Sequence, residues 1–370
     1  MRILLLGDYS NVHWTLGEGL RRLGHDVTVA SDGDGWKGYP RDVDLRRRSL
    51  GWRGTLGFFL RLARQFPAFR GYDVVQIINP VFLPLRAERI FPFYRYLRRH
   101  NGAVFMGAFG MDYYWVRAGM DCRTFRYSDF NLGPRLRRDK DNEEFIRDWL
   151  NGPKGVLNRR IADDCDGIVA GLYEYYASYA PHHADKLAFI PFPIPPTGCQ
   201  PLAHVPDRVR FFIGIQRRRS AYKGTDIMLR ALERVAAERP AECEMVKVES
   251  VPFAVYADLM DSSHVLLDQL YSYTPAMNAL HAMSKGKVVV GGGEPENYAI
   301  LHEDELRPIV NVLPDEASVY RALNQLLDRR DELPELSRQS LAYIARHHDY
   351  LKVAQQYVDL WQGRKSQVLR

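Results

Sequence analysis

Basic residues follow an apolar segment in the second half of the chain. Residues 210–213 have the pattern of a strand that ends at Gly214, and Arg217, Arg218 and Lys223 precede the next expected helix. Ligands of open α/β sheets bind at the carboxyl ends of the strands, and guanidinium and ammonium groups neutralise phosphate oxygens. We interpret this segment as a diphosphate-binding loop. A solvated basic loop is the alternative and the usual meaning of such a run of charge.

A helix start is expected further along the chain. Thr274 is expected to cap this helix, with Pro275 at its first position, and the helix is expected to reach Met283. Free N–H groups at the amino end of a helix attract anions. The N–H groups near Ala276 and Met277 are therefore expected to contact the same diphosphate.

One face of this helix carries Asn278 and His281, which are three positions apart. Residues with this spacing are neighbours on a helix surface, so both are candidates for contact with the nucleoside or sugar of one ligand. An ordinary core or interface histidine is the alternative interpretation of His281.

Glycines and acidic residues follow a later expected strand. Three consecutive glycines, Gly292 and Gly293 among them, allow the backbone to approach a ligand closely. Glu294 and Glu296 come next and can accept hydrogen bonds from ribose or sugar hydroxyls. A flexible turn is the alternative.

Loops after strands also mark the first half of the chain. His13 lies in the loop after the first expected strand, and Asp112 is the only acid in residues 107–115, which follow a later strand. Both loops are expected to open into a cleft. The first loop lacks the Gly-x-Gly-x-x-Gly pattern, which argues against a dinucleotide cofactor.

Two Asp-x-Asp sequences, at residues 32–34 and 164–166, have the composition of a divalent-metal site. Both lie far in sequence from the basic loop. Arginine, lysine and helix N–H groups can neutralise a leaving diphosphate without a metal. We therefore expect neither a metal nor another cofactor.

Alternating strand and helix patterns run through the chain. A strand at 3–6, a helix and a second strand at 27–30 predict a βαβ unit of a parallel sheet. Prolines cluster between residues 191 and 206 and mark a linker, after which a second alternating series begins. We therefore expect two doubly wound, Rossmann-like α/β domains that face a cleft.

The linker sets the expected domain boundaries. We place the N-terminal domain at residues 1–195 and the C-terminal domain at residues 207–347. Residues 348–370 include a helical pattern with Leu351 and Trp361 on one apolar face, which needs a partner surface. This final helix is expected to cross back onto the N-terminal domain.

Taken together, the segments of the second half resemble the donor-binding half of GT-B glycosyltransferases of the retaining glycosyltransferase family 4. The family pattern Glu-Ala-Met-small-x-Gly aligns with residues 281–286, and Gly-Gly-x-Pro-Glu aligns with residues 292–296. The resemblance covers nearly the whole chain. It implies that Arg217, or its neighbour Arg218, and Lys223 hold the diphosphate of a nucleotide-sugar donor.

The sequence departs from this family at two glutamates that are usually eight positions apart. Tyr273 and His281 stand at these places. The resemblance implies that His281 contacts the donor ribose as a neutral group and that Tyr273 lies near the donor sugar. It also implies that Asp112 acts near the reacting carbon or the acceptor, and we give His13 a similar role. Capping of the following helix is the alternative for Asp112.

The function implied by the resemblance is that of a retaining, metal-independent glycosyltransferase of the hexosyltransferase type, with polysaccharide biosynthesis as one context. The N-terminal domain would bind a glycan, a lipid-linked molecule or a small acceptor. Two alternatives stay open. One is a GT-B sugar-nucleotide epimerase, and the other is a non-catalytic nucleotide-sugar-binding homologue, which the changes at Tyr273 and His281 make credible.

Composition and charge are those of a protein that binds anions. The net charge is +6 and the isoelectric point is about 9.0, which suits nucleotides, phospholipid headgroups or nucleic acid. We expect a nucleotide ligand and no nucleic acid. The four cysteines lie far apart and predict neither a disulfide framework nor a zinc site. We expect a cytoplasmic protein, because no signal peptide or membrane span is evident.

Residues 52–70 mix aromatic and aliphatic residues with arginines. A basic amphipathic segment is typical of a membrane-surface contact, here at the inner face of the membrane, or of a lipid-linked acceptor site. A packed helix with a solvated arginine face is the alternative.

Overall fold

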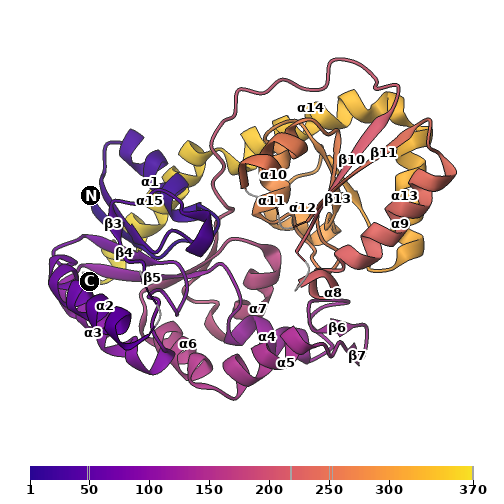
Figure 1. Cartoon of the computed structure of the whole chain (residues 1–370). Coiled ribbons are helices and arrows are strands. Elements are labelled where there is room, and N and C mark those ends of the chain that lie inside the picture. The colour runs from indigo at the N-terminus through magenta and orange to yellow at the C-terminus, as the bar shows by residue number, and fades with distance from the viewer. Residues whose placement is uncertain (48, 50, 217–218, 250, 252, 369–370) are drawn as a thin grey trace. The chain divides into compact units, whose positions relative to one another are not determined.

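The computed structural model describes residues 1–47, 49, 51–216, 219–249, 251 and 253–368 (Figure 1). The chain divides into two units. The first consists of Met1–Arg117, Phe145–Pro195 and Tyr350–Arg370, and the second of Ala118–Glu144 and Pro196–Asp349. Residues 118–144, which we call the inserted segment, thus fold with the second unit although they lie in the first half of the sequence.

The first unit is built on a seven-stranded parallel sheet with the order β3-β2-β1-β4-β5-β8-β9. Its strands are β1 Arg2–Leu6, β2 Asp26–Ser31, β3 Val43–Asp44, β4 Val74–Ile77, β5 Ala103–Ala108, β8 Gly167–Ala170 and β9 Leu187–Phe189. Its helices are α1 Val12–Arg22, α2 Trp52–Gln65, α3 Phe91–His100, α6 Pro153–Asp164, α7 Tyr173–His183 and α15 Tyr350–Val368, with short turns η1 Gly35–Lys37, η2 Phe66–Ala68, η3 Ala87–Arg89 and η4 Ile146–Leu150. Every residue of β4, β5 and β8 is buried, as parallel strands are when helices cover both faces of the sheet.

The first βαβ unit forms as the sequence predicts. Leu4 of β1 pairs with Thr28 of β2 in parallel register, and α1 buries Leu16 and Leu20. The chain leaves α1 through Gly24, which has a φ of 85°. A residue in this left-handed conformation commonly ends a helix.

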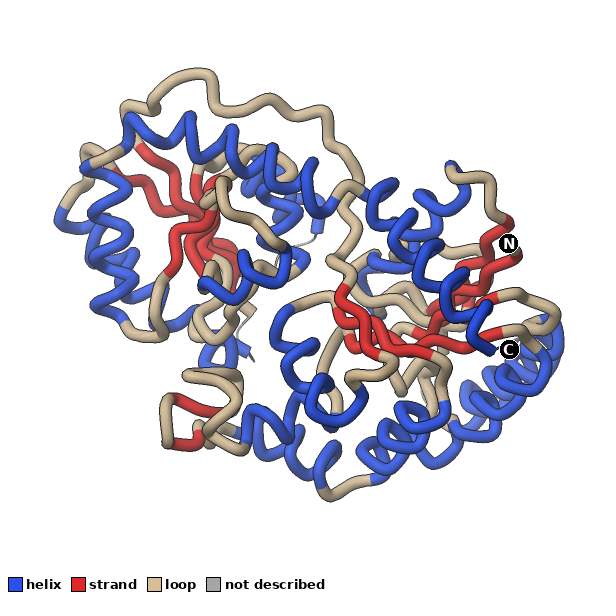
Figure 2. Tube along the Cα trace, turned by 180° about the vertical axis from the view of Figure 1, so that it is seen from behind, coloured by secondary structure: helices blue, strands red, loops and turns tan. Residues whose placement is uncertain are grey.

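The C-terminal helix α15 returns to the first unit, as predicted, and packs on α1. A Cβ on Gly19 would lie 2.6 Å from the carbonyl oxygen of Tyr350, so the two helices approach too closely for a side chain there. Trp361 is fully buried, with its ring centroid 6.3 Å from that of Phe105 in β5. Figure 2 shows α15 and both chain ends in this unit.

The second unit contains a five-stranded parallel sheet with the order β11-β10-β12-β13-β14. Its strands are β10 Val209–Ile215, β11 Cys243–Glu249, β12 Val265–Leu267, β13 Val288–Gly291 and β14 Ile309–Asn311. Its helices are α8 Ser220–Lys223, α9 Thr225–Glu238, α10 Phe253–Asp261, α11 Met277–Met283, α12 Pro295–Leu301, α13 Glu316–Asp328 and α14 Leu333–Tyr343, with η6 Arg330–Glu332 and η7 Ile344–His348. The expected class of two doubly wound α/β domains is confirmed.

The inserted segment carries a two-stranded antiparallel hairpin, β6 Asn131–Leu132 and β7 Arg135–Leu136, and is flanked by α4 Tyr113–Met120 and α5 Lys140–Phe145. It docks at the carboxyl edge of the five-stranded sheet. The Tyr222 hydroxyl donates a 2.6 Å hydrogen bond to Asp129. The Arg137 guanidinium donates to the Ala221 carbonyl over 2.8 Å and lies 3.3 Å from the ring centroid of Tyr271. These contacts hold the inserted segment against the loops that follow β10 and β12.

The start of α11 differs from the sequence prediction. The helix begins at Met277, and the preceding Ala276 has an extended backbone with a φ of −86° and a ψ of −178°. Thr274 lies in a bend two residues earlier, and Thr274 and Pro275 are both buried. The prediction that Thr274 caps the helix was therefore wrong, because Ala276 occupies the N-cap position and the helix begins two residues later than the capping pattern suggested.

Candidate functional site

Lys223 ends the short helix α8, immediately before Gly224. Gly224 has a φ of 74°, and a Cβ on it would lie 2.8 Å from Cβ of Leu270, so only glycine fits without displacement. The Lys223 carbonyl accepts a 3.0 Å hydrogen bond from the N–H of Leu270. The half-buried Lys223 is thus held against the segment after β12. Arg217 and Arg218 lie outside the described residues.

A chain of hydrogen bonds links the ends of β12, α11 and α10 beside Lys223. The Asn278 amide donates a 3.0 Å hydrogen bond to Oδ1 of Asp268, and the Tyr256 hydroxyl donates a 2.9 Å bond to Oδ1 of Asn278. Burial raises the pKa of Asp268, whereas the Lys223 ammonium and the Asn278 amide lower it. A cation, an anion and an amide therefore meet at the carboxyl ends of β10 and β12, where ligands of open sheets bind.

Gly214 and Tyr256 complete this cluster. A Cβ on Gly214 would lie 2.6 Å from the Tyr256 ring, so the aromatic ring covers the end of β10 because the strand lacks a side chain there. Burial raises the pKa of the Tyr256 hydroxyl, which therefore stays protonated and donates to Asn278. The tyrosine fixes the orientation of the Asn278 amide.

His281 is half-buried one turn after Asn278. Burial is the main cause that lowers the pKa of His281, and the nearby Lys285 lowers it further, while Asp261 of α10 raises it. The imidazole is therefore neutral at pH 7. Asn278 bonds to Tyr256, so its side chain faces α10. The sequence analysis placed Asn278 and His281 on one helix face.

Tyr273 is buried beneath the inserted segment. Its hydroxyl accepts a 2.7 Å hydrogen bond from the backbone N–H of Arg126, whose guanidinium lies 4.8 Å from the Tyr273 ring centroid. The Tyr273 carbonyl accepts a 3.0 Å bond from the N–H of Glu294. Tyr273 therefore joins the inserted segment to the loop after β13.

Both acids of that loop are bonded to the inserted segment. Arg126 donates 2.8 Å and 3.0 Å hydrogen bonds to the carboxylates of Glu294 and Glu296. The buried Glu294 also accepts bonds from the Tyr127 hydroxyl and, over 3.0 Å, from the Asn311 amide. Arg126 lowers the pKa of Glu296. A ligand that used the Glu296 carboxylate would have to share it with Arg126.

The glycines of this loop approach protein atoms closely. A Cβ on Gly292 would lie 2.3 Å from the Ser272 carbonyl oxygen, and one on Gly293 would lie 2.8 Å from the Ile309 side chain. Both positions thus require glycine for packing alone. The close approach that the sequence analysis assigned to a ligand is made here by the protein itself.

In the first unit, His13 lies in the first turn of α1 rather than in the preceding loop, and it is fully buried. Its Nδ1 lies 2.7 Å from the Gly7 carbonyl oxygen, and a carbonyl can only accept, so Nδ1 carries the proton. Among the described residues, Nε2 has no hydrogen-bond partner. Burial lowers the pKa of His13 to about 3. His13 is thus a neutral imidazole with an unpaired lone pair on a buried Nε2.

Asp112 follows β5 in the same unit and is also fully buried. It accepts a 2.9 Å hydrogen bond from the N–H of Trp115 and a 2.8 Å bond from the Tyr179 hydroxyl. Burial raises the pKa of Asp112 to about 7. The first bond caps α4, which is the alternative role considered from the sequence, and the raised pKa places proton exchange near neutral pH.

Acidic residues of the two Asp-x-Asp sequences form ion pairs. Asp164 and Asp166 both pair with Arg98, and Asp34 pairs with Lys37 over 2.6 Å. These contacts give each of the three a structural partner.

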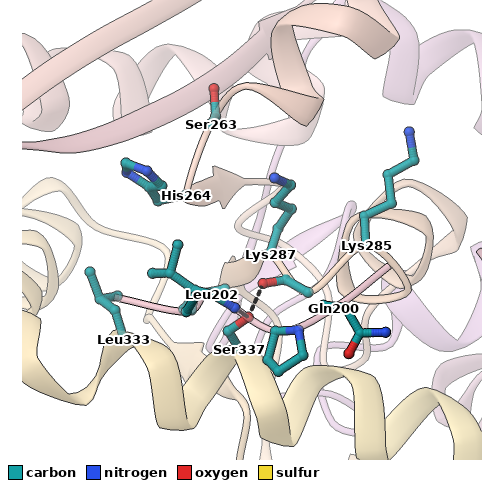
Figure 3. Close-up of a pocket in the computed structure, with 12 residues that line it drawn as sticks. Gln200, Leu202, Ser263, His264, Lys285, Lys287, Leu333 and Ser337 are labelled. Atoms are coloured by element: carbon teal, nitrogen blue, oxygen red, sulfur yellow. Dashed lines mark hydrogen bonds between the residues drawn. The ribbon is translucent and has the colours of Figure 1, made fainter. Parts of the chain in front are cut away.

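A cavity of about 250 Å³ lies at the opposite edge of the second unit's sheet (Figure 3). His264 and Val288, at the amino ends of β12 and β13, line it together with Lys285, Lys287 and Ser337. The cavity lies at the amino ends of these strands, whereas the cluster around Lys223 lies at the carboxyl ends, where ligands of open sheets bind. The two are therefore separate.

Sequence reasoning missed three residues of the carboxyl edge. Asp268 directly follows the apolar strand β12, and a polar residue at that position is itself a signal of a site. Tyr256 lies in a helix without a motif. Arg126 lies in the first half of the chain, and nothing in its neighbourhood indicated that it docks on the second sheet.

No protein-family model and no curated protein sequence matches the chain. Solved structures match nearly all of it. Sucrose-phosphate synthase from Thermosynechococcus elongatus has a TM-score of 0.63 and 13% sequence identity, over 98% of this chain and 99% of that chain. The catalytic domain of starch synthase IV from Arabidopsis thaliana, bound to ADP and acarbose, gives 0.61 and 11%, over 99% of both chains. HepE from Anabaena in complex with UDP-glucose gives 0.60 and 11%, over 98% of this chain and 100% of that chain.

These similarities define the fold. The chain has the GT-B fold, with two parallel α/β sheets and a C-terminal helix that returns to the first unit, as the resemblance implied. At this level of identity the similarity speaks for the fold alone. No helix within the described part of the chain has the length and apolar character needed to cross a membrane.

Proposed function

We propose that this chain is a glycosyltransferase that moves a sugar from a nucleotide-diphosphate sugar to an acceptor hydroxyl. The observation that carries the proposal is the meeting of Lys223, Asp268 and Asn278 at the carboxyl ends of adjacent strands of the second unit. Solved structures of two similar proteins hold ADP or UDP-glucose, which supports a nucleotide ligand.

The donor diphosphate would be bound by Lys223, by Arg217 or its neighbour Arg218, and by the N–H groups near Ala276 and Met277. As the bond between the sugar and the diphosphate breaks, negative charge grows on the leaving oxygen, and these groups stabilise it without a metal. A positioned charge of this kind contributes about 3 kcal/mol of transition-state stabilisation. The nucleoside and sugar would be contacted by His281, Asn278, Tyr273, Gly292, Gly293 and Glu296.

The acceptor would be bound by the first unit. The acceptor oxygen forms the new bond to the anomeric carbon as the bond to the diphosphate breaks, its proton passes to a base on the acceptor side, and the nucleoside diphosphate leaves. His13 offers a neutral Nε2 lone pair, and Asp112 has a pKa near neutrality, so both are proposed as acceptor-side residues. Retention of the anomeric configuration is proposed from the family resemblance.

A chain that binds a nucleotide-sugar without turning it over is the second candidate. Its support is the place of Tyr273, which stands where the family has an acid and whose hydroxyl is bonded to the Arg126 backbone.

A donor screen followed by a turnover assay tests the proposal. Nucleoside diphosphates and nucleotide-sugars should raise the melting temperature, because a ligand of the native state stabilises it. The best donor is then incubated with a panel of glycan and lipid-linked acceptors, and release of nucleoside diphosphate is followed. Acceptor-dependent release supports a transferase, whereas conversion of the donor alone indicates an epimerase. Binding without turnover favours the second candidate, and absence of binding rejects both.

A further inference from the structure

Helix α2 of the first unit presents an apolar stripe to solvent. Trp52, Leu56 and Leu60 are 73%, 53% and 57% exposed, the highest values among the large hydrophobic side chains that the structure describes. Their spacing of four residues places them along one side of the helix. Phe58 and Leu62 face the other way and are buried. The helix therefore has a second apolar face, which no described part of its unit covers and which is exposed to solvent.

Positive charge borders this stripe on one side. Arg53 and Arg64 are exposed and fall next to Leu60 in the helical rotation of about 100° per residue. The sequence from residue 45 to residue 72 contains seven arginines and neither aspartate nor glutamate. Arg46 pairs with Asp44 just outside this stretch, and the stretch itself carries a net positive charge.

A cavity of about 280 Å³ lies on the other side of the stripe. Three arginines, Arg47, Arg86 and Arg89, line it together with Thr55 and Phe59 of α2. The Arg89 guanidinium lies 5.6 Å from the Phe59 ring centroid. In Figure 1, α2 lies at the outer side of this unit. Several guanidinium groups around one cavity suit a phosphate.

We propose that α2 is a membrane-docking element that binds the surface of a bilayer rich in anionic phospholipid. Trp52, Leu56 and Leu60 enter the boundary between headgroups and acyl chains, as the apolar side of an interfacial helix does. The arginine cavity takes a lipid phosphate, and the exposed arginines gain from the negative surface potential. A second copy of the chain fits this face poorly, because a symmetric contact would bring the arginines of the two copies together.

Vesicle flotation of the full-length chain tests the proposal. Vesicles of phosphatidylcholine are compared with an equal mixture of phosphatidylcholine and phosphatidylglycerol. The protein should float with the mixed vesicles, and binding should fall as salt rises, since salt screens surface charge. The double variant Leu56→Ser/Leu60→Ser should lower the partition coefficient about tenfold or more, because each substitution removes an apolar side chain that the membrane buries. The control Val156→Ser/Leu313→Ser changes two exposed apolar residues elsewhere and should bind as the wild type does.

A second pair of variants tests the arginine cavity. Arg86→Gln/Arg89→Gln should reduce the preference for anionic vesicles several-fold. Arg135→Gln/Arg321→Gln removes the same charge at other exposed sites and should not. The blue shift of tryptophan fluorescence on mixed vesicles should disappear in Trp52→Phe. The proposal is overturned if the wild type does not bind mixed vesicles, if the serine pair binds like its control, or if the serine pair instead abolishes a dimer seen by light scattering.

Discussion

The side-chain amide of Asn278 donates a 3.0 Å hydrogen bond to the carboxylate of Asp268. This bond ties α11 to the end of β12, next to Lys223, and the Tyr256 hydroxyl completes it from α10. A neutral donor thus satisfies part of a half-buried carboxylate that also interacts with the charge of Lys223.

Replacing Asn278 by leucine keeps the approximate size of the side chain and removes both hydrogen bonds. The Asp268 carboxylate and the Tyr256 hydroxyl would each lose a partner, which should cost about 1–3 kcal/mol of unfolding free energy. Urea denaturation followed by circular dichroism measures the loss. Asn151→Leu, at an exposed site, serves as the control. Equal stability of both variants would show that the hydrogen-bonded chain contributes nothing.

Arg126 should stabilise the second unit through its ion pairs with Glu294 and Glu296. Arg126→Gln leaves the buried Glu294 without its cation, although Tyr127 and Asn311 still donate to it. Because Arg126 is half-exposed, we expect a loss of about 1–3 kcal/mol. In a double-mutant cycle with Glu296→Gln, the two losses should be less than additive. Additive losses would mean that the ion pair of Arg126 with Glu296 is not formed in solution. The control Arg135→Gln, on the same inserted segment, should have little effect on stability.

Asp112 should make stability depend on pH. Its pKa of about 7 lies above the ordinary value of 3.8, so the folded state binds the proton more tightly than the unfolded state does. This contribution is fully present below pH 4 and is lost as pH rises toward 7. In Asp112→Asn the unfolding free energy should fall less steeply with rising pH over this range. The slopes of the variant and the wild type should differ by up to about 1.4 kcal/mol per pH unit. Chemical denaturation at a series of pH values measures the slope. An unchanged slope, like that expected for the exposed control Asp304→Asn, would contradict the burial argument.

The sequence was most informative where a single element carries its own pattern. Apolar runs such as residues 103–106 lie in strands that are buried on both faces, and this gives them a composition that can be recognised without context. The apolar spacing of Leu351 and Trp361 likewise indicated a helix with one apolar face; Trp361 is buried and Leu351 is half-buried. The packing of an element against the core determines both its burial and its apolar periodicity, so the fold class could be predicted from the sequence.

The inserted segment could not be placed in this way. Its strands are two residues long, too short to show an alternating pattern, and its partners Glu294 and Tyr222 are distant in sequence. The same limit applies to Asp268, because its importance depends on a neighbouring strand that the local sequence does not reveal. The prediction that Thr274 caps α11 failed for a related reason, since burial of Thr274 in the tertiary structure overrode its local capping preference.

Isothermal titration of nucleoside diphosphates into the wild type and Lys223→Ala tests the central claim most directly. A lost charge-assisted hydrogen bond to phosphate is worth about 1.5–3 kcal/mol, so affinity should fall roughly ten- to a hundred-fold. The control Lys247→Ala removes an exposed lysine of the same unit and should bind as the wild type does. Equal affinity of Lys223→Ala and the wild type would contradict a diphosphate site at the end of α8.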